Sequence, residues 1–203
     1  MFDKYLMPIS QKPLHSVAEI LVKRGIKADH ITILGFAIGI FGAVCIAFQL
    51  FWLGLIGILV NRLCDGLDGA VARLSGVSDA GGYLDIVLDF IFYSAIALSF
   101  GVADPSTNAL AAALLIFSFM GTGSSFLAFA IMAEKHAIKT LDYGKKSLYF
   151  LGGITEGFET IVFFVLMCLM PHYFVYLACL FAGLCAITTV TRIVAAYHML
   201  RQV

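Results

Sequence analysis

Six long apolar runs constrain the fold of this chain more than any other feature of its sequence. They lie near residues 30–50, 52–74, 82–103, 109–133, 147–170 and 172–198. Each is long enough to cross about 30 Å of hydrocarbon as a helix. Only 13% of the 203 residues are charged and 61% are hydrophobic, as is typical of membrane proteins. The runs therefore predict an all-α bundle of six transmembrane helices.

The basic residues predict how these spans are oriented. None of the 13 Lys and Arg lies in the predicted connections between spans one and two, three and four, or five and six. By the positive-inside rule, both chain ends are expected on the cytoplasmic side. The first run begins well inside the chain, so no cleavable signal peptide is expected and span one should direct targeting. The formal net charge of zero leaves no basic surface for nucleic acid.

Residues 1–28 are predicted to form a lead-in to a six-span domain over residues 29–203. Apolar positions Leu14, Val17, Ile20 and Leu21 recur at helical spacing, and a glycine follows. This pattern favours an amphipathic juxtamembrane helix on the cytoplasmic leaflet. A soluble helix that binds a partner is the alternative.

Four aspartates stand out against this apolar background, near the cytoplasmic ends of spans two and three. Asp65 and Asp68 are three residues apart and Asp85 and Asp89 four, so each pair shares a helix face. Carboxylates this close either protonate or hold a cation when they are removed from water. Mg²⁺ or Mn²⁺ would take their oxygens and complete its shell with phosphate oxygens. The sequence therefore predicts a divalent metal site that binds a phosphate ester.

Small residues and an arginine share the wall of the first aspartate pair. Gly69 and Ala72 leave room for a ligand, and Arg73 offers a planar fork suited to phosphate. The segment that follows, SGVSDAGG, is predicted to be a turn between two helices. Its acid, Asp79, is expected to be a cap or solvated turn residue in preference to a metal ligand. A soluble phosphoryl-transfer fold is not indicated, because the chain has no GxxxxGK[ST] loop.

At these residues the sequence resembles the CDP-alcohol phosphotransferase (phosphatidyltransferase) family. The family signature D-x2-D-G-x2-A-R-x7-8-G-x3-D-x3-D is met in full by Asp65, Asp68, Gly69, Ala72, Arg73, Gly81, Asp85 and Asp89. The resemblance implies transfer of a substituted phosphate group from a CDP-linked donor to an alcohol, with release of CMP. For a small bacterial-type member in the cytoplasmic (inner) membrane, it implies CDP-diacylglycerol as donor, a phospholipid product and a homodimer.

The same resemblance implies a role for each signature residue. Asp65, Asp68 and Asp85 would bind two divalent ions, Mg²⁺ or Mn²⁺, and Asp89 would contribute to a metal and act as general base. The CDP group would lie against Asp65, Gly69, Ala72, Arg73, Gly81 and Asp85.

The start of span one departs from the family pattern. Members often show Pro-Asn-x-x-Thr there, whereas this chain has Ala28 and Asp29 in the first two positions. Asp29 is expected to cap the helix. Gly35, Gly39 and Gly42 follow and predict close helix packing.

The alcohol acceptor is the part of the reaction that the sequence constrains least. Lys135, Lys139, Lys146 and Arg192 favour a phosphorylated polyol such as glycerol 3-phosphate, which would make the chain resemble a phosphatidylglycerophosphate synthase. Serine, inositol and inositol phosphate remain open, because lysines between spans four and five also serve as topology signals. His136 is expected to be a solvated loop residue.

Polar residues within the predicted spans have both structural and functional interpretations. Glu156 and Glu159 share one face of span five, about 14–18 Å from its start by helical rise. Arg192 is their candidate partner, in either a structural ion pair or an acceptor-recognition site. The hydroxyl run at 121–125 is expected to pack helices in preference to lining a lipid groove. The five cysteines lie in apolar runs without metal-ligand spacing and are expected to be buried thiols.

A membrane cation channel or transporter is the alternative from a different functional class. Against it, the acids gather at one membrane face and no internal repeat is apparent. Metal-dependent CMP release would discriminate the enzyme from the channel.

Overall fold

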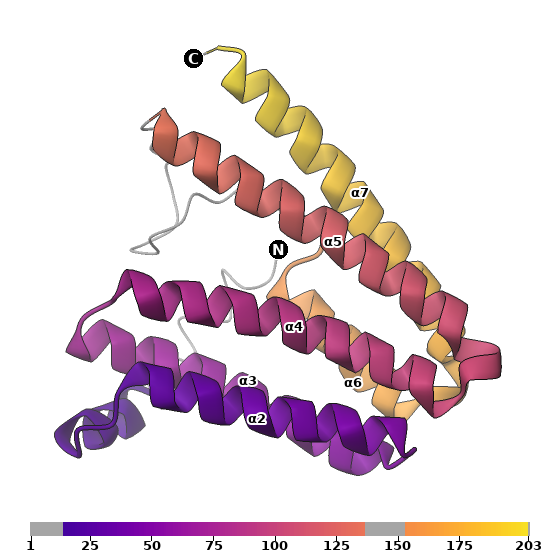
Figure 1. The fold of residues 1–203 in the computed structure, drawn as a ribbon, viewed down its shortest axis with the longest axis horizontal. Coiled ribbons are helices and arrows are strands. Elements are labelled where there is room, and N and C mark those ends of the chain that lie inside the picture. Colours follow the sequence, from indigo (N-terminus) through magenta and orange to yellow (C-terminus); the bar gives the residue numbers. More distant parts are fainter. Residues whose placement is uncertain (1–13, 137–152, 203) are drawn as a thin grey trace.

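The computed structural model describes residues 14–136 and 153–202, and every regular element within them is helical. A first helix covers residues 14–23. The elements that follow are α2 (Ala28–Ala47), α3 (Phe51–Ser75), α4 (Asp79–Ala103), α5 (Pro105–Lys135), α6 (Gly157–Leu169), the 3-10 helix η1 (Pro171–Tyr173) and α7 (Phe174–Leu200) (Figure 1). The predicted all-α fold is confirmed for the described part of the chain.

Four of the helical segments have the length and composition needed to cross a membrane. They are α2, α4, α5 and the segment Pro171–Leu200, which correspond to predicted spans one, three, four and six. Helix α3 has 25 residues, but its middle carries Arg62, Asp65 and Asp68, so composition alone does not mark it as a span. Large apolar side chains cover the outer surface, for example Leu110 and Phe117 on α5, as membrane contact requires.

Predicted span five differs from the structure. Residues 147–152 lie outside the described part of the chain, but residues 153–156 are described and are not helical. Helix α6 begins only at Gly157, because Glu159 accepts a hydrogen bond from the backbone N–H of Glu156 (3.0 Å) and so caps the helix there. The expectation of a continuous helix is wrong at this point. Glu156 and Glu159 therefore lie at the start of α6, and not within a continuous helix.

The helices form two groups that diverge from one end of the molecule. Helices α2, α3 and α4 lie side by side, α4 turns sharply into α5, and α5 runs beside α7 (Figure 1). Helix α6 packs against α3 and α7. Asp104 caps α5 at the sharp turn, where hydrogen bonds from Ser106 and Thr107 lower the pKa of its carboxyl.

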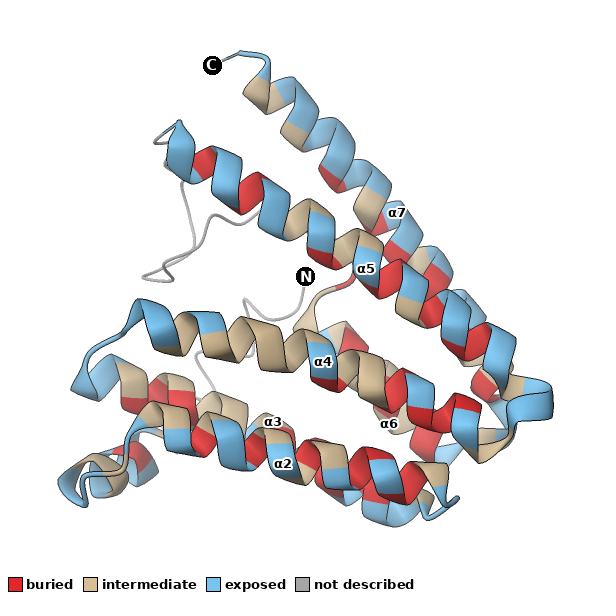
Figure 2. Ribbon diagram, in the orientation of Figure 1, coloured by how far each residue is buried: buried red, intermediate tan, exposed pale blue. Residues whose placement is uncertain are grey.

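A core of aromatic rings fills the space where α4, α5, α6 and α7 meet. Phe100 stacks on Phe174 with ring centroids 4.7 Å apart, and Phe163 stacks on Phe181 at 4.4 Å. Figure 2 shows the buried residues on the inward faces of the helices and the exposed residues on their outward faces. The core supplies a rigid base beneath the polar residues of α3 and α4.

The N-terminal helix over residues 14–23 packs against α3 and the start of α2. Ala18 is fully buried in a small cluster with Ile31, Ala70 and Val71. Two of the predicted apolar positions, Val17 and Ile20, are 46% and 52% exposed. The leaflet placement of this helix and the domain boundary at residue 28 stay predictions.

The cysteines follow the prediction only in part. Cys45, Cys168 and Cys185 are buried free thiols. Cys64 is half-buried and Cys179 is exposed, because Cys179 lies on the outward face of α7.

Candidate metal and phosphate site

The α3–α4 hairpin brings the two aspartate pairs together in one pocket. The turn at residues 76–78 reverses the chain, and Gly76 takes the positive φ of 107° that it needs. Ser78 then caps α4 by accepting a hydrogen bond from the backbone N–H of Gly81 (3.0 Å). Asp79 is the first residue of α4 and is exposed, which agrees with the predicted turn position.

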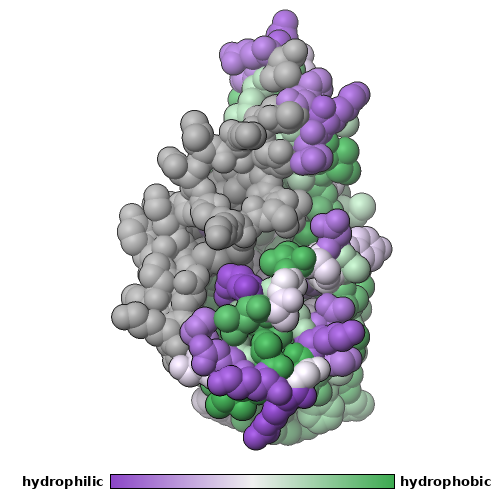
Figure 3. Space-filling model, turned by 90° about the vertical axis from the view of Figure 1, so that its left-hand side faces the viewer, coloured by the Kyte–Doolittle hydropathy of each residue, from purple (hydrophilic) through white to green (hydrophobic). Residues whose placement is uncertain are grey.

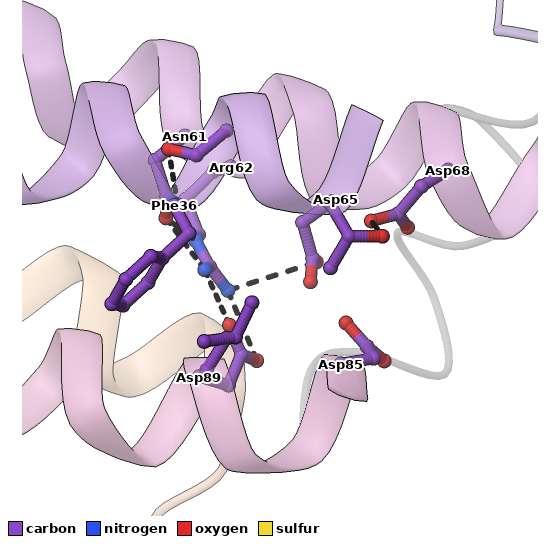
Figure 4. A pocket seen from close by; sticks show the side chains of 10 residues that line it. Phe36, Asn61, Arg62, Asp65, Asp68, Asp85 and Asp89 are labelled. Atoms are coloured by element: carbon purple, nitrogen blue, oxygen red, sulfur yellow. Dashed lines mark hydrogen bonds and ion pairs between the residues drawn. The ribbon is translucent and has the colours of Figure 1, made fainter. Parts of the chain in front are cut away.

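Three of the four aspartates converge closely. One carboxylate oxygen from each of Asp65, Asp68 and Asp85 lies within 4.8 Å of the others. Figure 4 shows these side chains pointing toward one another across the gap between α3 and α4. The pocket around them is lined by Thr32, Gly35, Phe36, Asn61, Arg62, Asp65, Asp68, Asp85, Leu88 and Asp89. Oxygen donors this close together fit a hard divalent cation such as Mg²⁺ or Mn²⁺.

Asp68 is the most deeply buried of the three. It is only 6% exposed, and its Oδ2 accepts a hydrogen bond of 2.6 Å from the Thr32 hydroxyl. Thr32 lies on α2, so a third helix helps to orient this carboxylate. The sequence placed Thr32 in a family-like stretch but gave it no role at the site.

Arg62 is a site residue that the sequence analysis does not identify. Its Nη2 lies 2.6 Å from Asp89 Oδ1, and its Nη1 lies 3.3 Å from Asp89 Oδ2 and 3.6 Å from Asp65 Oδ2. The guanidinium therefore bridges the two helices and the two aspartate pairs (Figure 4). The available signal was its position three residues before Asp65, on the same helix face.

Several neighbours hold the Arg62 side chain in place. The Asn61 amide oxygen accepts hydrogen bonds from Arg62 Nε (2.8 Å) and Nη2 (2.6 Å), and the Asn61 amide nitrogen donates to the Gly35 carbonyl on α2 (3.0 Å). The guanidinium also lies 4.9 Å from the ring centroid of Phe92 and 5.3 Å from that of Tyr93. Arg62 is thus fixed by three helices.

Asp89 lines the same pocket but is not part of the close trio. In addition to Arg62, its Oδ2 accepts a hydrogen bond from the Tyr93 hydroxyl (3.2 Å). Its predicted roles as metal ligand and general base stay predictions.

The remaining signature residues, Gly69, Ala72, Arg73 and Gly81, are not among the residues that line the pocket. The Arg73 side chain passes close to Gly69, where an added Cβ would lie 3.3 Å from Arg73 Nη1, and Ala72 is half-buried beside them. A Cβ at Gly81 would lie 3.0 Å from the Asp29 carboxylate. Asp29 does not cap α2 as expected, because the helix begins one residue earlier, after Lys27.

The predicted acceptor residues are not brought together in the described part of the chain. Lys139 and Lys146 lie outside the described residues, and Lys135 is exposed in the last turn of α5. Arg192 is buried on α7, where it donates to the Thr122 carbonyl (3.3 Å) and faces the Phe126 ring. His136 is exposed directly after α5, in line with its expected solvation.

The side chains of Arg192 and Glu156 both lie next to Gly153. The Gly153 backbone N–H donates to Glu156 Oε1 (3.2 Å), and a Cβ at Gly153 would lie 3.1 Å from Arg192 Nη2. The 121–125 run packs against neighbouring helices as predicted, since a Cβ at Gly121 would lie 3.1 Å from Thr189 Oγ1 on α7 and one at Gly123 would lie 2.7 Å from the Phe90 ring on α4. Thr122 and Ser125 donate to carbonyls of their own helix.

Comparison with known protein families and sequences gives a consistent result. The family model described as CDP-alcohol phosphatidyltransferase matches residues 26–195. Inner membrane protein YnjF of Escherichia coli (strain K12) is 48% identical over 202 residues, which cover 100% of this chain and 98% of that protein. Archaetidylinositol phosphate synthase of Pyrococcus horikoshii is 34% identical over 99 residues, 48% of this chain and 52% of that protein.

Two solved structures share the fold. Mycobacterium tuberculosis phosphatidylinositol phosphate synthase with CDP-DAG bound has a TM-score of 0.74 at 20% identity, with 91% of this chain and 93% of that chain covered. The same enzyme in complex with manganese and citrate has a TM-score of 0.68 at 21% identity, with 91% and 88% covered. At these identities the likeness concerns the helical arrangement alone.

Proposed function

Because the chain belongs to the CDP-alcohol phosphatidyltransferase family, we propose that it transfers a phosphatidyl group from CDP-diacylglycerol to an alcohol and releases CMP. The observation that carries this proposal is the convergence of Asp65, Asp68 and Asp85 within 4.8 Å. Such a trio suits a divalent ion that also binds a pyrophosphate. Membership in a transferase family favours this enzyme over a channel or transporter.

The donor would be held by the three converging aspartates and by the other residues of the family signature. Asp65, Asp68 and Asp85 would hold Mg²⁺ or Mn²⁺, which when bound neutralises the pyrophosphate and the charge that develops on leaving CMP. The Thr32 hydroxyl would keep Asp68 in its ligating orientation. Arg73, at the exposed end of α3, would contact a donor phosphate, and Gly69, Ala72 and Gly81 would admit the CDP group.

Asp89 would act as the general base. As the acceptor oxygen attacks the phosphorus that carries the lipid, its proton would pass to Asp89, and the bond to the CMP oxygen would break. Asp89 Oδ2 is the better placed oxygen, because its contacts with Arg62 and Tyr93 (3.3 and 3.2 Å) are longer than the 2.6 Å contact at Oδ1. The acceptor hydroxyl needs only to reach hydrogen-bond distance of that oxygen.

For the acceptor we propose a phosphorylated polyol, with glycerol 3-phosphate as first candidate on the strength of Lys135, Lys139, Lys146 and Arg192. Inositol phosphate is the second candidate, because half of the chain is 34% identical to archaetidylinositol phosphate synthase. The site is proposed to face the cytoplasm. The proposed location in a bacterial inner membrane agrees with the name of the relative that covers the whole chain. A homodimer stays a prediction.

The test is CMP release by the purified protein in detergent, with CDP-diacylglycerol, Mg²⁺ or Mn²⁺, and one acceptor at a time. The panel comprises glycerol 3-phosphate, inositol phosphate, inositol and serine. Asp85→Asn should reduce release to background, whereas Asp79→Asn, which removes an exposed acid outside the trio, should leave it unchanged. Metal-dependent release with one acceptor identifies the substrate. No release with any acceptor, together with no metal-dependent binding of CDP-diacylglycerol, would overturn the proposal.

A further inference from the structure

An arginine stands where a second metal ion would be expected. The family resemblance implies two divalent ions among the four aspartates, yet only Asp65, Asp68 and Asp85 come within 4.8 Å of one another. The space between Asp65 and Asp89 holds the Arg62 guanidinium, with contacts of 3.6 Å and 2.6 Å to the two carboxylates. The four aspartates therefore divide into a trio and an ion pair.

Neighbouring residues hold the Arg62 side chain in the pocket. Its side chain is only 16% exposed, and both its Nε and its Nη2 donate to Asn61. The Asn61 side chain is itself tied to the backbone of α2, and two aromatic rings flank the guanidinium. Moving Arg62 out of the pocket would break these contacts together and leave Asp89 without its bidentate partner.

A second ion would need the same space. In two-metal sites the ions lie about 3.5–4 Å apart. An ion that bridges Asp65 and Asp89 would meet the fixed guanidinium charge and compete for both carboxylates.

We propose that Arg62 is a built-in cation that replaces the second divalent ion, so that the chain binds a single ion through Asp65, Asp68 and Asp85. Arg62 is then a positioning residue that holds the Asp89 carboxylate in place through a bidentate contact. The catalytic meaning of this arrangement rests on the proposed function, but the number of ions does not. A one-ion site and a two-ion site differ in the number of ions bound per chain, which can be measured directly.

The experiment counts Mn²⁺ on the purified full-length protein by equilibrium dialysis, with and without CDP-diacylglycerol. Electron paramagnetic resonance of the same samples distinguishes an isolated Mn²⁺ from a coupled pair. The wild-type protein is expected to bind one Mn²⁺ per chain with an isolated-ion spectrum. Arg62→Gln should bind a second Mn²⁺ and show coupling, whereas Arg62→Lys should remain at one.

Two further variants serve as controls. Arg24→Gln removes the same charge from an exposed position outside the pocket and should leave the count at one. Asp89→Asn should also bind one Mn²⁺ with affinity within about twofold of wild type, because Asp89 pairs with Arg62 and not with the ion. This variant decides the question even where Arg62→Gln proves too unstable to purify.

Three results would overturn the proposal. They are two Mn²⁺ on the wild-type protein, loss of an ion in Asp89→Asn, and a count that stays at one in a folded Arg62→Gln. Each is independent of CMP release. An inactive protein that binds one Mn²⁺ would therefore contradict the proposed reaction and leave the assignment of Arg62 intact.

Discussion

The Thr32 hydroxyl shows how a neutral group far away in sequence sets the geometry of a charged one. Asp68 is nearly buried, so its carboxylate needs either a partner or a cation. Thr32 supplies one hydrogen bond to Oδ2, and a backbone hydrogen bond from Gly69 adds a second to the carboxylate. A carboxylate has about four lone-pair sites, so two remain for an ion. Hydrogen bonds of this kind orient a ligand before the metal arrives, and removing one typically weakens metal affinity or activity 10–100-fold.

We therefore expect Thr32→Val, which keeps the side-chain shape and removes the hydroxyl, to weaken Mn²⁺ binding by about 10–100-fold. Thr122→Val is the matched control, because that hydroxyl donates only to a carbonyl of its own helix. Isothermal titration with Mn²⁺ measures both variants. An unchanged affinity in Thr32→Val would show that the hydrogen bond to Asp68 does not prepare the site.

At the residue scale, sequence reasoning identified the acids but not the groups that organise them. The spacing of Asp65 and Asp68 fixes a shared helix face whatever the tertiary structure. The partners of Asp89 depend instead on how α4 packs against α3 and on which way the Arg62 side chain turns. An arginine near a predicted membrane face fits a topology signal equally well, so its inward orientation could be found only from the structure.

At the scale of elements, the crossing of α2 and α3 depends on two glycines. Gly42 and Gly57 face each other so closely that a Cβ at Gly57 would lie 2.7 Å from the Gly42 Cα. Backbone atoms cannot yield as a flexible side chain can, so any side chain here must separate the helices. The same two helices carry Thr32 and Asp68 toward one end, and the close crossing therefore fixes that contact as well.

Gly57→Ala should lower the free energy of unfolding by roughly 1–3 kcal/mol through this clash. It should also weaken Mn²⁺ binding, because separation of α2 from α3 lengthens the Thr32–Asp68 hydrogen bond. Gly183→Ala is the control, since a Cβ there has nothing within 4 Å. Thermal unfolding in detergent and Mn²⁺ titration measure the two effects. Equal stability of both variants would contradict the role of the crossing.

Element boundaries were predicted well wherever apolar length alone decided them. The predicted span at 82–103 corresponds to α4 at Asp79–Ala103, for example. Span five was misjudged, because hydropathy does not register a helix start made by Glu156 and Glu159. The two acids were predicted to share one helix face with Arg192 as their candidate partner, whereas in the structure they form a capping box at the start of α6.

At the scale of the whole molecule, polar groups gather at one end of the bundle. Figure 3 views the end that carries the α3–α4 turn, and hydrophilic residues collect on this face. The opposite end holds the short α2–α3 and α4–α5 turns, where Phe48 and Trp52 are 74% and 71% exposed. This polarity matches the distribution of basic residues in the sequence.

The orientation can be tested with two single-cysteine variants in a chain whose five native cysteines are replaced. Val77→Cys places an exposed thiol in the turn beside the acidic pocket, and Ser106→Cys places one at the opposite end. If the pocket faces the cytoplasm, a membrane-impermeant maleimide should label position 106 in cells with a permeabilised outer membrane. Position 77 should be labelled only after the inner membrane is opened. Labelling of position 77 in intact spheroplasts would place the pocket on the outer side, where cytoplasmic CDP-lipid head groups and phosphorylated acceptors could not reach it.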